Sequence, residues 1–272
     1  MNNKQSLHIH TTYADGKNKP EELVIRAIER GFGSIGFSEH SYLAYPVSSH
    51  QMTVADTENY KREIAQLKSK YKGKIDIFCG MEYDIYSDLS TDGFDYLIGS
   101  VHLLDCGGDI SDFDLGPEAT HEYIDKHFDG DGLAFVKRYY ETVATFPSVK
   151  SVDILGHFDI VVKNNEKLGF VDTASKEYLD LGYAAIHSLR GKIPFFEVNT
   201  GAIARGYRSI PYPQMEFLKE FRRLGFGAVL NSDCHNKDFI DCYYDEATQL
   251  LIEAGYKTKW ILTTDGFKEV AL

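Results

Sequence analysis

Two kinds of segment alternate along this chain. Seven short runs are rich in apolar and β-branched residues, and most are followed by a stretch in which apolar side chains recur at helical spacing. The runs cover residues 6–10, 34–40, 75–82, 94–102, 151–157, 194–199 and 227–235. Strands that alternate with helices are typical of a parallel sheet wrapped by helices, and the pattern fits an open sheet as well as a closed barrel.

The helical stretches have recognisable ends. Pro20 suits the first turn of a helix and Gly31 suits its C-terminal cap, which predicts a helix over residues 20–30. Further helices are predicted over residues 56–71, 133–146, 173–189, 212–224 and 244–254. Residues 104–132 are rich in Gly and Asp and too long for an ordinary connection, so we expect a functional loop or lid there. Residues 260–262 predict a last strand or a segment that packs across the barrel.

The composition is that of an ordinary globular protein. The chain has 272 residues, of which 43% are hydrophobic, and this excludes disorder as a description of the whole. No repeat or low-complexity linker divides it, so we expect a single domain over residues 1–272. The four cysteines show no CxxC spacing, and we expect them to be reduced and to pack as small apolar side chains.

The charge balance limits the partners. A formal net charge of −12 disfavours nucleic acid and anionic membrane surfaces as bulk partners. The N-terminus lacks the basic and apolar regions of a signal peptide, and no uncharged apolar run approaches the roughly 18 residues that span a membrane. We therefore expect a cytoplasmic protein; the oligomeric state stays open.

Histidine and carboxylate side chains gather at the ends of the predicted strands. Six of the ten histidines do so. They are His8, His10, His40, His102, His157 and His235, and they are joined by Glu82, Asp233 and, in the turn after the first run, Asp15. Residues two apart in a strand point to one face, so His8 and His10 project together, as do Asp233 and His235.

These residue types indicate a metal centre. Imidazole nitrogen and carboxylate oxygen without thiolate suit Zn, Mn or Fe. Nine candidate ligands exceed what one ion uses, so the sequence predicts two or three divalent ions, with Glu82 suited to bridge a pair. Such ions would give an acidic protein a local site for a small phosphorylated substrate.

The same residues carry a family resemblance over nearly the whole chain. The segments are His8-Ile9-His10 with Asp15-Gly16, Ser38-Glu39-His40, Gly80-Met81-Glu82, Gly99-Ser100-Val101-His102, Gly156-His157, Glu197-Val198-Asn199-Thr200-Gly201 and Ser232-Asp233-Cys234-His235. In order and placement they resemble the motifs of the polymerase and histidinol phosphatase (PHP) family. Within that family the chain is most similar to the branch that acts on L-histidinol phosphate.

The resemblance implies a distorted (β/α)7 barrel that holds three divalent metal ions at the C-terminal ends of its strands. By motif, His8, His10, Glu82 and Asp233 would bind the first ion. Glu82, His102 and His157 would bind the second ion, and Asp15, His40 and His235 the third. This chain departs from the family pattern at two positions. Several family members have histidine where this chain has Asp15, and Cys234 stands where a smaller residue is usual between Asp233 and His235.

The resemblance also implies the reaction. It is the hydrolysis of a phosphomonoester, L-histidinol phosphate in histidine biosynthesis, by a metal-bridging hydroxide. Glu82 and Asp233 are the predicted catalytic residues, and Asp233 is the candidate proton acceptor or donor.

Residues near the predicted mouth of the barrel are candidates for substrate binding. Arg205 and Arg208 follow the sixth run and suit phosphate oxygens. Glu197 shares a strand face with Asn199, and it either meets the ammonium group of the substrate or orients the metal ligands. Tyr42 and Tyr207 are candidates for stacking on an imidazole. The acidic residues Asp105, Asp109 and Asp112 either contact a cationic substrate or are solvated.

Three other functions remain open. A phosphoesterase of the same family would act on nucleotides or nucleic acid ends, although the acidic charge disfavours DNA. An amidohydrolase-like enzyme would cleave a C–N bond, but no strand-end lysine occupies a ligand position of the kind that such sites carboxylate. A metal-storing or regulatory protein would have no turnover.

Overall fold

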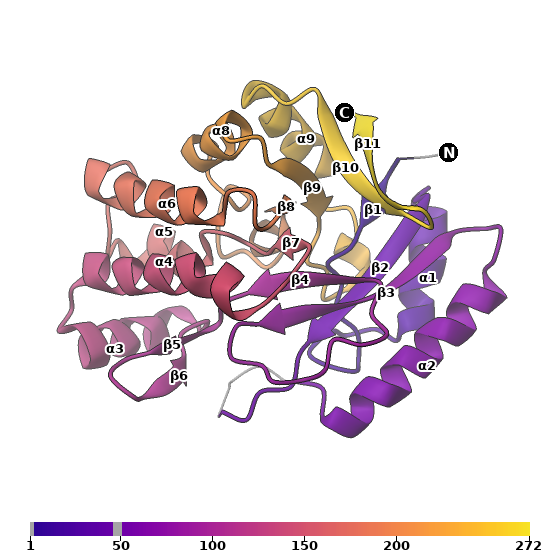
Figure 1. Cartoon of the computed structure of the whole chain (residues 1–272), viewed down its shortest axis with the longest axis horizontal. Coiled ribbons are helices and arrows are strands. Elements are labelled where there is room, and N and C mark those ends of the chain that lie inside the picture. The colour runs from indigo at the N-terminus through magenta and orange to yellow at the C-terminus, as the bar shows by residue number, and fades with distance from the viewer. Residues whose placement is uncertain (1–2, 46–50) are drawn as a thin grey trace.

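A parallel sheet curled into a nearly closed barrel forms the centre of the computed structural model, which describes residues 3–45 and 51–272 (Figure 1). Within these residues the sheet has seven strands, in the order β1-β2-β3-β4-β7-β8-β9, and each neighbouring pair is parallel. The strands are β1 Gln5–Ser6, β2 Ser34–His40, β3 Asp76–Asp84, β4 Tyr96–Ser100, β7 Ile154–Leu155, β8 Phe195–Asn199 and β9 Gly227–Asn231. The prediction of a distorted seven-stranded barrel is confirmed.

Helices surround the barrel, as predicted from the apolar spacing (Figure 1). The longer ones are α1 Pro20–Glu29, α2 Val54–Lys70, α3 Pro117–Phe128, α4 Gly132–Val149, α6 Lys176–Leu189, α8 Met215–Arg223 and α9 Tyr244–Glu253. Short helical turns are α5 Asn165–Leu168, α7 Gly201–Ala204, η1 Ile160–Val162 and η2 Lys237–Phe239. Because each of these helices buries an apolar stripe, the spacing of apolar residues was enough to find all of them except α3.

Residues 104–132 differ from the prediction. They contain most of a β-hairpin, β5 Leu103–Asp105 with β6 Ile110–Asp112, and helix α3, so the expectation of a loop or lid was wrong. Gly107 and Gly108 have positive φ angles and allow the hairpin turn, while the buried Tyr123 and Ile124 anchor α3. A segment rich in Gly and Asp concealed the two short strands and the 12-residue helix α3.

Apolar side chains fill the barrel near the N-terminal ends of its strands. Tyr96 lies at the centre of this group, and its hydroxyl donates to the carbonyl oxygens of Phe37, at 3.0 Å, and of Leu7. A Cβ atom at Gly36 or Gly80 would lie 2.4 or 2.2 Å from Tyr96 atoms. Glycine at both positions therefore makes room for the tyrosine ring.

A hairpin of the last two strands covers this end of the barrel. It consists of β10 Thr258–Thr263 and β11 Gly266–Ala271, which form their own antiparallel sheet. Gln5 Nε2 donates to Leu262 O at 2.8 Å, and Leu262 N donates to Gln5 Oε1 at 2.8 Å. Trp260 and Phe267 pack on the apolar group around Tyr96. The predicted last strand is confirmed as part of this hairpin.

Two further expectations concern helices and cysteines. In the described residues, no helix is both long and apolar enough to cross a membrane. All four cysteines are free thiols, and Cys79 and Cys234 are buried, as expected for reduced cysteines that pack as apolar side chains.

Candidate metal centre

The nine predicted ligands converge at the C-terminal end of the barrel. His40 and Glu82 lie within β2 and β3, and the other seven lie in the segments that follow strands. Ligand atoms within 4.8 Å of one another form four overlapping groups in the described chain. The groups are His10, Asp15, His40 and His235; His8, His10 and Asp233; His8, Glu82 and His157; and His40, Glu82 and His102. Together they include all nine residues, although the partition differs from the one that the resemblance implies.

Glu82 lies at the centre of the cluster. Its Oε1 is 2.8 Å from His157 Nε2 and 3.3 Å from His102 Nε2. Its Oε2 is 2.9 Å from His40 Nδ1, 3.3 Å from His8 Nε2 and 3.4 Å from His10 Nε2. Each oxygen thus faces a different set of imidazoles, which is the geometry expected of a carboxylate that bridges two cations.

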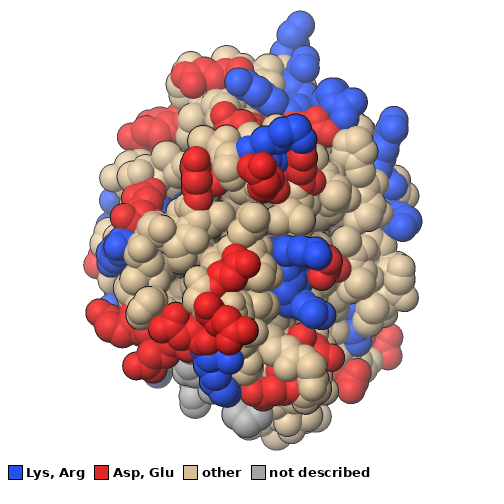
Figure 2. Space-filling model, turned by 90° about the vertical axis from the view of Figure 1, so that its left-hand side faces the viewer, with Lys and Arg blue, Asp and Glu red and all other residues tan. Residues whose placement is uncertain are grey.

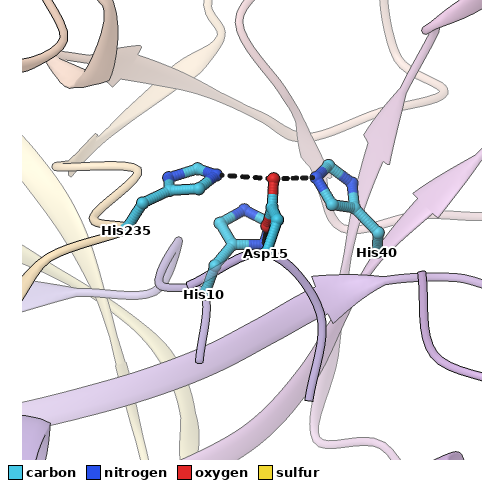
Figure 3. A group of neighbouring side chains, drawn as sticks. All are labelled: His10, Asp15, His40 and His235. Atoms are coloured by element: carbon cyan, nitrogen blue, oxygen red, sulfur yellow. Dashed lines mark hydrogen bonds and ion pairs between the residues drawn. The ribbon is translucent and has the colours of Figure 1, made fainter. Parts of the chain in front are cut away.

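Asp15 joins a second part of the cluster (Figure 3). Its Oδ2 lies between His235 Nε2, at 3.2 Å, and His40 Nε2, at 3.6 Å, and its Oδ1 is 3.5 Å from His10 Nδ1. A Cβ atom at Gly16 would lie 2.4 Å from the backbone of His10, so glycine permits the turn that folds Asp15 back. The sequence places Asp15 in the turn after the first run, and this turn brings the carboxylate back to His10.

Burial and neighbouring charges set the protonation states. Burial, together with His235 and His40, lowers the pKa of His10 to about 3, which leaves a neutral imidazole with a free lone pair. Burial opposes ionisation of Glu82, but His8, His40 and His102 hold its pKa well below the usual value. His10 and Glu82 are therefore in the forms that bind metal, a neutral imidazole and an ionised carboxylate. Burial favours the neutral forms of His8, His40 and His102, but neighbouring carboxylates raise the pKa of each, so metal binding there would release protons.

The donor set fits divalent cations. Among the described residues, several buried polar atoms of the cluster lack a hydrogen-bond partner: His8 Nε2, both nitrogens of His10, Asp15 Oδ1, Glu82 Oε2 and His157 Nδ1. Buried polar atoms are normally satisfied, and lone pairs of N and O that point toward one another are satisfied by a cation.

Two further carboxylates support the ligands from behind. Asp84 Oδ2 is 2.9 Å from His102 N and 3.2 Å from His102 Nδ1, and Glu197 contacts His8 Nδ1 at 3.0 Å. Such contacts fix the ring orientation of a metal-ligating histidine. Sequence analysis missed Asp84, although it lies two residues after Glu82 in the same strand and thus on the same face.

A cavity of about 210 Å³ adjoins the cluster and contains two cationic side chains, Arg205 and Lys163. Arg205 Nη2 is 2.9 Å from Asp233 Oδ2, and its Nη1 is 2.7 Å from His235 Nδ1. Lys163 pairs with Asp114 and lies 5.0 Å from the centroid of the Tyr207 ring. The sequence pattern indicated Arg205 and Tyr207 but not Lys163, because only the fold brings the turn after His157 to the cavity.

The structure does not bring the other predicted substrate residues to this cavity. Arg208 is buried and pairs with Asp159 at 3.3 Å, so its assignment as a phosphate contact is corrected. Glu197 has no exposed surface, so it does not meet the ammonium group of a substrate, and the role of orienting metal ligands remains. Tyr42 is 39% exposed and does not line the cavity, so its assignment as a stacking residue is also corrected.

The acidic residues of segment 104–132 lie in different places. Asp109 pairs with the exposed Lys126 at 3.3 Å, and Asp105 lines a separate surface pocket. Asp112 and Asp114 border a small pocket beside His40 and His102. This segment therefore reaches the metal cluster through its second strand and the residues that follow.

Comparisons with known proteins identify the family of this chain. Residues 6–200 match the PHP domain family. The histidinol-phosphatase of Lactococcus lactis subsp. lactis (strain IL1403) is 25% identical over 272 residues, which cover 93% of this chain and 92% of that protein. The histidinol-phosphatase of Bacillus subtilis (strain 168) is 25% identical over 265 residues, or 89% of this chain and 97% of that protein.

Two solved structures share the fold. Histidinol phosphate phosphatase from Lactococcus lactis subsp. lactis Il1403, complexed with zinc, L-histidinol and phosphate, has a TM-score of 0.72 and 21% identity, and the match covers 97% of this chain and 98% of that one. A candidate histidinol phosphatase from Listeria monocytogenes has a TM-score of 0.78 and 20% identity, and the match covers 89% of this chain and 99% of that one. At these identities, the likeness establishes the barrel fold.

Proposed function

Because this chain belongs to the PHP domain family, we propose that it is a metal-dependent phosphatase that hydrolyses L-histidinol phosphate to L-histidinol and phosphate. The curated relatives that bear the name histidinol-phosphatase match along most of their length, which supports this substrate over another phosphomonoester. The observation that carries the proposal is the convergence of nine metal-ligand side chains around Glu82, beside a cavity that presents Arg205 and Lys163.

The proposed cofactors are three divalent ions, Zn, Mn or Fe. The nine residues of the four groups would hold them, with Glu82 as the shared ligand. Such ions, when bound, lower the pKa of coordinated water and neutralise negative charge on a phosphoryl group.

The side chains of this chain have separate roles in the proposed reaction. Arg205 and Lys163 supply positive charge on the cavity wall, where they would pair with phosphoryl oxygens and stabilise the charge that grows during hydrolysis. Arg205 also holds Asp233 in place through its contact with Oδ2. Tyr207 lines the same cavity and offers an aromatic face to the imidazole of the substrate.

Asp233 is the proposed proton acceptor. It has a positive φ of 46°, a strained value for a residue other than glycine, and its Oδ1 lies 3.5 Å from His10 Nε2. A Cβ atom at Gly201 would lie 2.7 Å from Asp233, so glycine at the end of the Glu197–Gly201 motif leaves room for this carboxylate.

We also propose that residues 1–272 form one domain. Its substrate is a small molecule. Strand β9 and the β10–β11 hairpin lie beyond the residues that match the family, yet they complete the barrel and cover its end. Acidic side chains gather over the lower left of the face in Figure 2, which disfavours a nucleic acid backbone there.

The test is phosphate release by the purified protein from L-histidinol phosphate, a nucleoside monophosphate and p-nitrophenyl phosphate. Each is measured before chelation, after chelation, and after Zn or Mn is restored. We expect selective release from L-histidinol phosphate that is lost with chelator and recovered with metal. Metal-dependent release from the other two esters alone would refute the substrate, and no release from any of them would refute phosphatase activity.

A further inference from the structure

Glu197 is a buried carboxylate of β8 that contacts two of the proposed metal ligands. Its Oε1 accepts a hydrogen bond from the backbone N–H of His157 at 2.7 Å. His8 Nδ1 lies 3.1 and 3.0 Å from its two oxygens. Because the side chain has no exposed surface, it acts on the centre through these ligands and through Asn199, whose Nδ2 also donates to Asp233 Oδ2 at 3.3 Å.

Two asparagine amides complete the surroundings of Glu197, and backbone groups fix the orientation of each amide. Asn231 Oδ1 accepts from Leu7 N–H at 2.7 Å, so its Nδ2 donates to Glu197 Oε2 at 2.8 Å. Asn199 Oδ1 accepts from Gly201 N–H at 2.9 Å, so its Nδ2 donates to Glu197 Oε1 at 2.8 Å. Glu197 therefore has three N–H donors whose identity is not ambiguous.

These contacts require a proton on His8 Nδ1. A carboxylate that accepts from three donors has only acceptor oxygens to offer, so His8 Nδ1 must donate to Glu197. His8 Nε2 faces Glu82 at 3.3 Å and Asp233 at 3.7 Å, so this nitrogen is the one that would bind a cation. A histidine held in this way by a carboxylate has a fixed tautomer and a fixed ring orientation for a metal.

The same network spans the seam where the barrel closes. Between β9 and β1 the structure shows an isolated bridge, Ile9 with Cys234, in place of a regular ladder. The side chain of Asn231, the last residue of β9, supplies the acceptor for Leu7 N–H next to His8. Cys234 N–H donates to His8 O at 3.3 Å and His10 N–H to Cys234 O at 2.9 Å, and the Asn231 amide adds a contact to this seam that also holds Glu197.

We propose that Asn231 and Glu197 are a pair of positioning residues that couple closure of the barrel seam to the affinity of the metal centre. Asn231 holds the β1 segment and Glu197 together, and Glu197 holds His8 with Nε2 toward the centre. Since coupling between two equilibria is reciprocal, a cation bound to His8 stabilises the seam in return. This inference rests on the proposed metal centre, adds Asn231 to it, and gives Glu197 a role in closing the barrel.

The first test measures zinc affinity of the Asn231→Asp and Glu197→Gln variants by competition with a chromophoric chelator, without substrate. Aspartate at position 231 keeps an oxygen for Leu7 N–H but places a second carboxylate against Glu197. Glutamine at position 197 replaces one acceptor oxygen with an NH₂ group, which would face the N–H donors of His157, Asn199 and Asn231. We expect zinc to bind each variant about 10–100-fold more weakly, as for other residues that support metal ligands from behind.

The matched control is Asn165→Asp. Like Asn231, Asn165 accepts from a backbone N–H, that of Val171 at 3.0 Å, and its Nδ2 donates to Val171 O at 2.8 Å. It contacts none of the nine proposed ligands. We expect this variant to bind zinc like the wild type. Wild-type zinc affinity in both test variants would overturn the proposal.

A second measurement needs only the wild-type fold. Amide hydrogen exchange of residues 5–10 is followed with zinc and with chelator, and we expect slower exchange with zinc. Exchange at the same rate in both conditions would overturn the proposed coupling, even if the variants fail to fold. A wild-type protein that binds no divalent metal would instead refute the proposed function, so the two failures are distinguishable.

Discussion

The two ends of the barrel contain different side chains, although the same strands run through both. Near the N-terminal ends, Tyr96, Phe78 and their neighbours form an apolar group covered by the β10–β11 hairpin. At the C-terminal ends, Glu82 lies among five histidines, and several buried atoms there lack partners in the described chain. Phe78 and Glu82 belong to one strand, β3, so the change in polarity occurs within a single element.

This difference teaches that stability and chemistry have separate locations in the molecule. Burial of apolar surface at the N-terminal end stabilises the barrel, whereas the concentrated charge at the other end is unfavourable without cations. We therefore expect substitutions at the N-terminal end to change the free energy of unfolding and substitutions at the C-terminal end to change metal binding and turnover.

Tyr96→Ala should have the largest effect. It removes a fully buried ring and two hydrogen bonds, so the free energy of unfolding should fall by about 3–5 kcal/mol. Denaturant unfolding of metal-free protein measures the change. The control Tyr96→Phe keeps the ring, and the loss should be about 1 kcal/mol. Equal stability of Tyr96→Ala and wild type would contradict the assigned role of the apolar group.

Glu82→Gln should lower kcat/KM for L-histidinol phosphate by about 100-fold to 1000-fold, because glutamine keeps the shape but loses the bridging charge. Steady-state kinetics and elemental analysis of bound metal measure the effect. In the presence of chelator, Glu82→Gln should lower the free energy of unfolding much less than Tyr96→Ala does. Undiminished turnover with full metal content would remove Glu82 from the centre.

Removal of metal is the third test. At a metal concentration about 100 times Kd, binding should stabilise the wild type by about 2.7 kcal/mol, so chelation should lower the melting temperature. Thermal unfolding followed by circular dichroism measures the shift. Tyr96→Phe should show the same shift as the wild type, since its change is at the other end, and Glu82→Gln should show less. An unchanged melting temperature of the wild type would argue against a stabilising cation.

Arg205→Lys should have the smallest effect, a rise in KM of about tenfold. Lysine keeps the charge but cannot form the paired contact of a guanidinium with phosphoryl oxygens. The matched control is Arg208→Lys, whose side chain pairs with Asp159 outside the cavity and should leave KM unchanged. If Arg208→Lys raised KM and Arg205→Lys did not, the assignment of the two arginines would be reversed.

Much of the fold could be predicted from the sequence because periodicity is a local property. Residues 34–40 and 20–29 have strand and helix patterns with clear ends, and both elements lie where expected. Short elements with little apolar periodicity escaped, as in segment 104–132. Strands β1 and β7 have only two residues each, shorter than the predicted runs. The rest of each run is irregular backbone that carries proposed metal ligands.

The sequence by itself determined which residues form the candidate metal-binding cluster, since histidine and carboxylate at the ends of parallel strands meet at one end of a barrel. It did not determine what stands behind or beside them. Two arginines in one loop, Arg205 and Arg208, look equivalent in the sequence, yet one lines the cavity and the other is buried against Asp159. Lys163 and Asp84 became relevant only in three dimensions. Such roles depend on burial and distance between segments far apart in the chain, and only tertiary packing sets these.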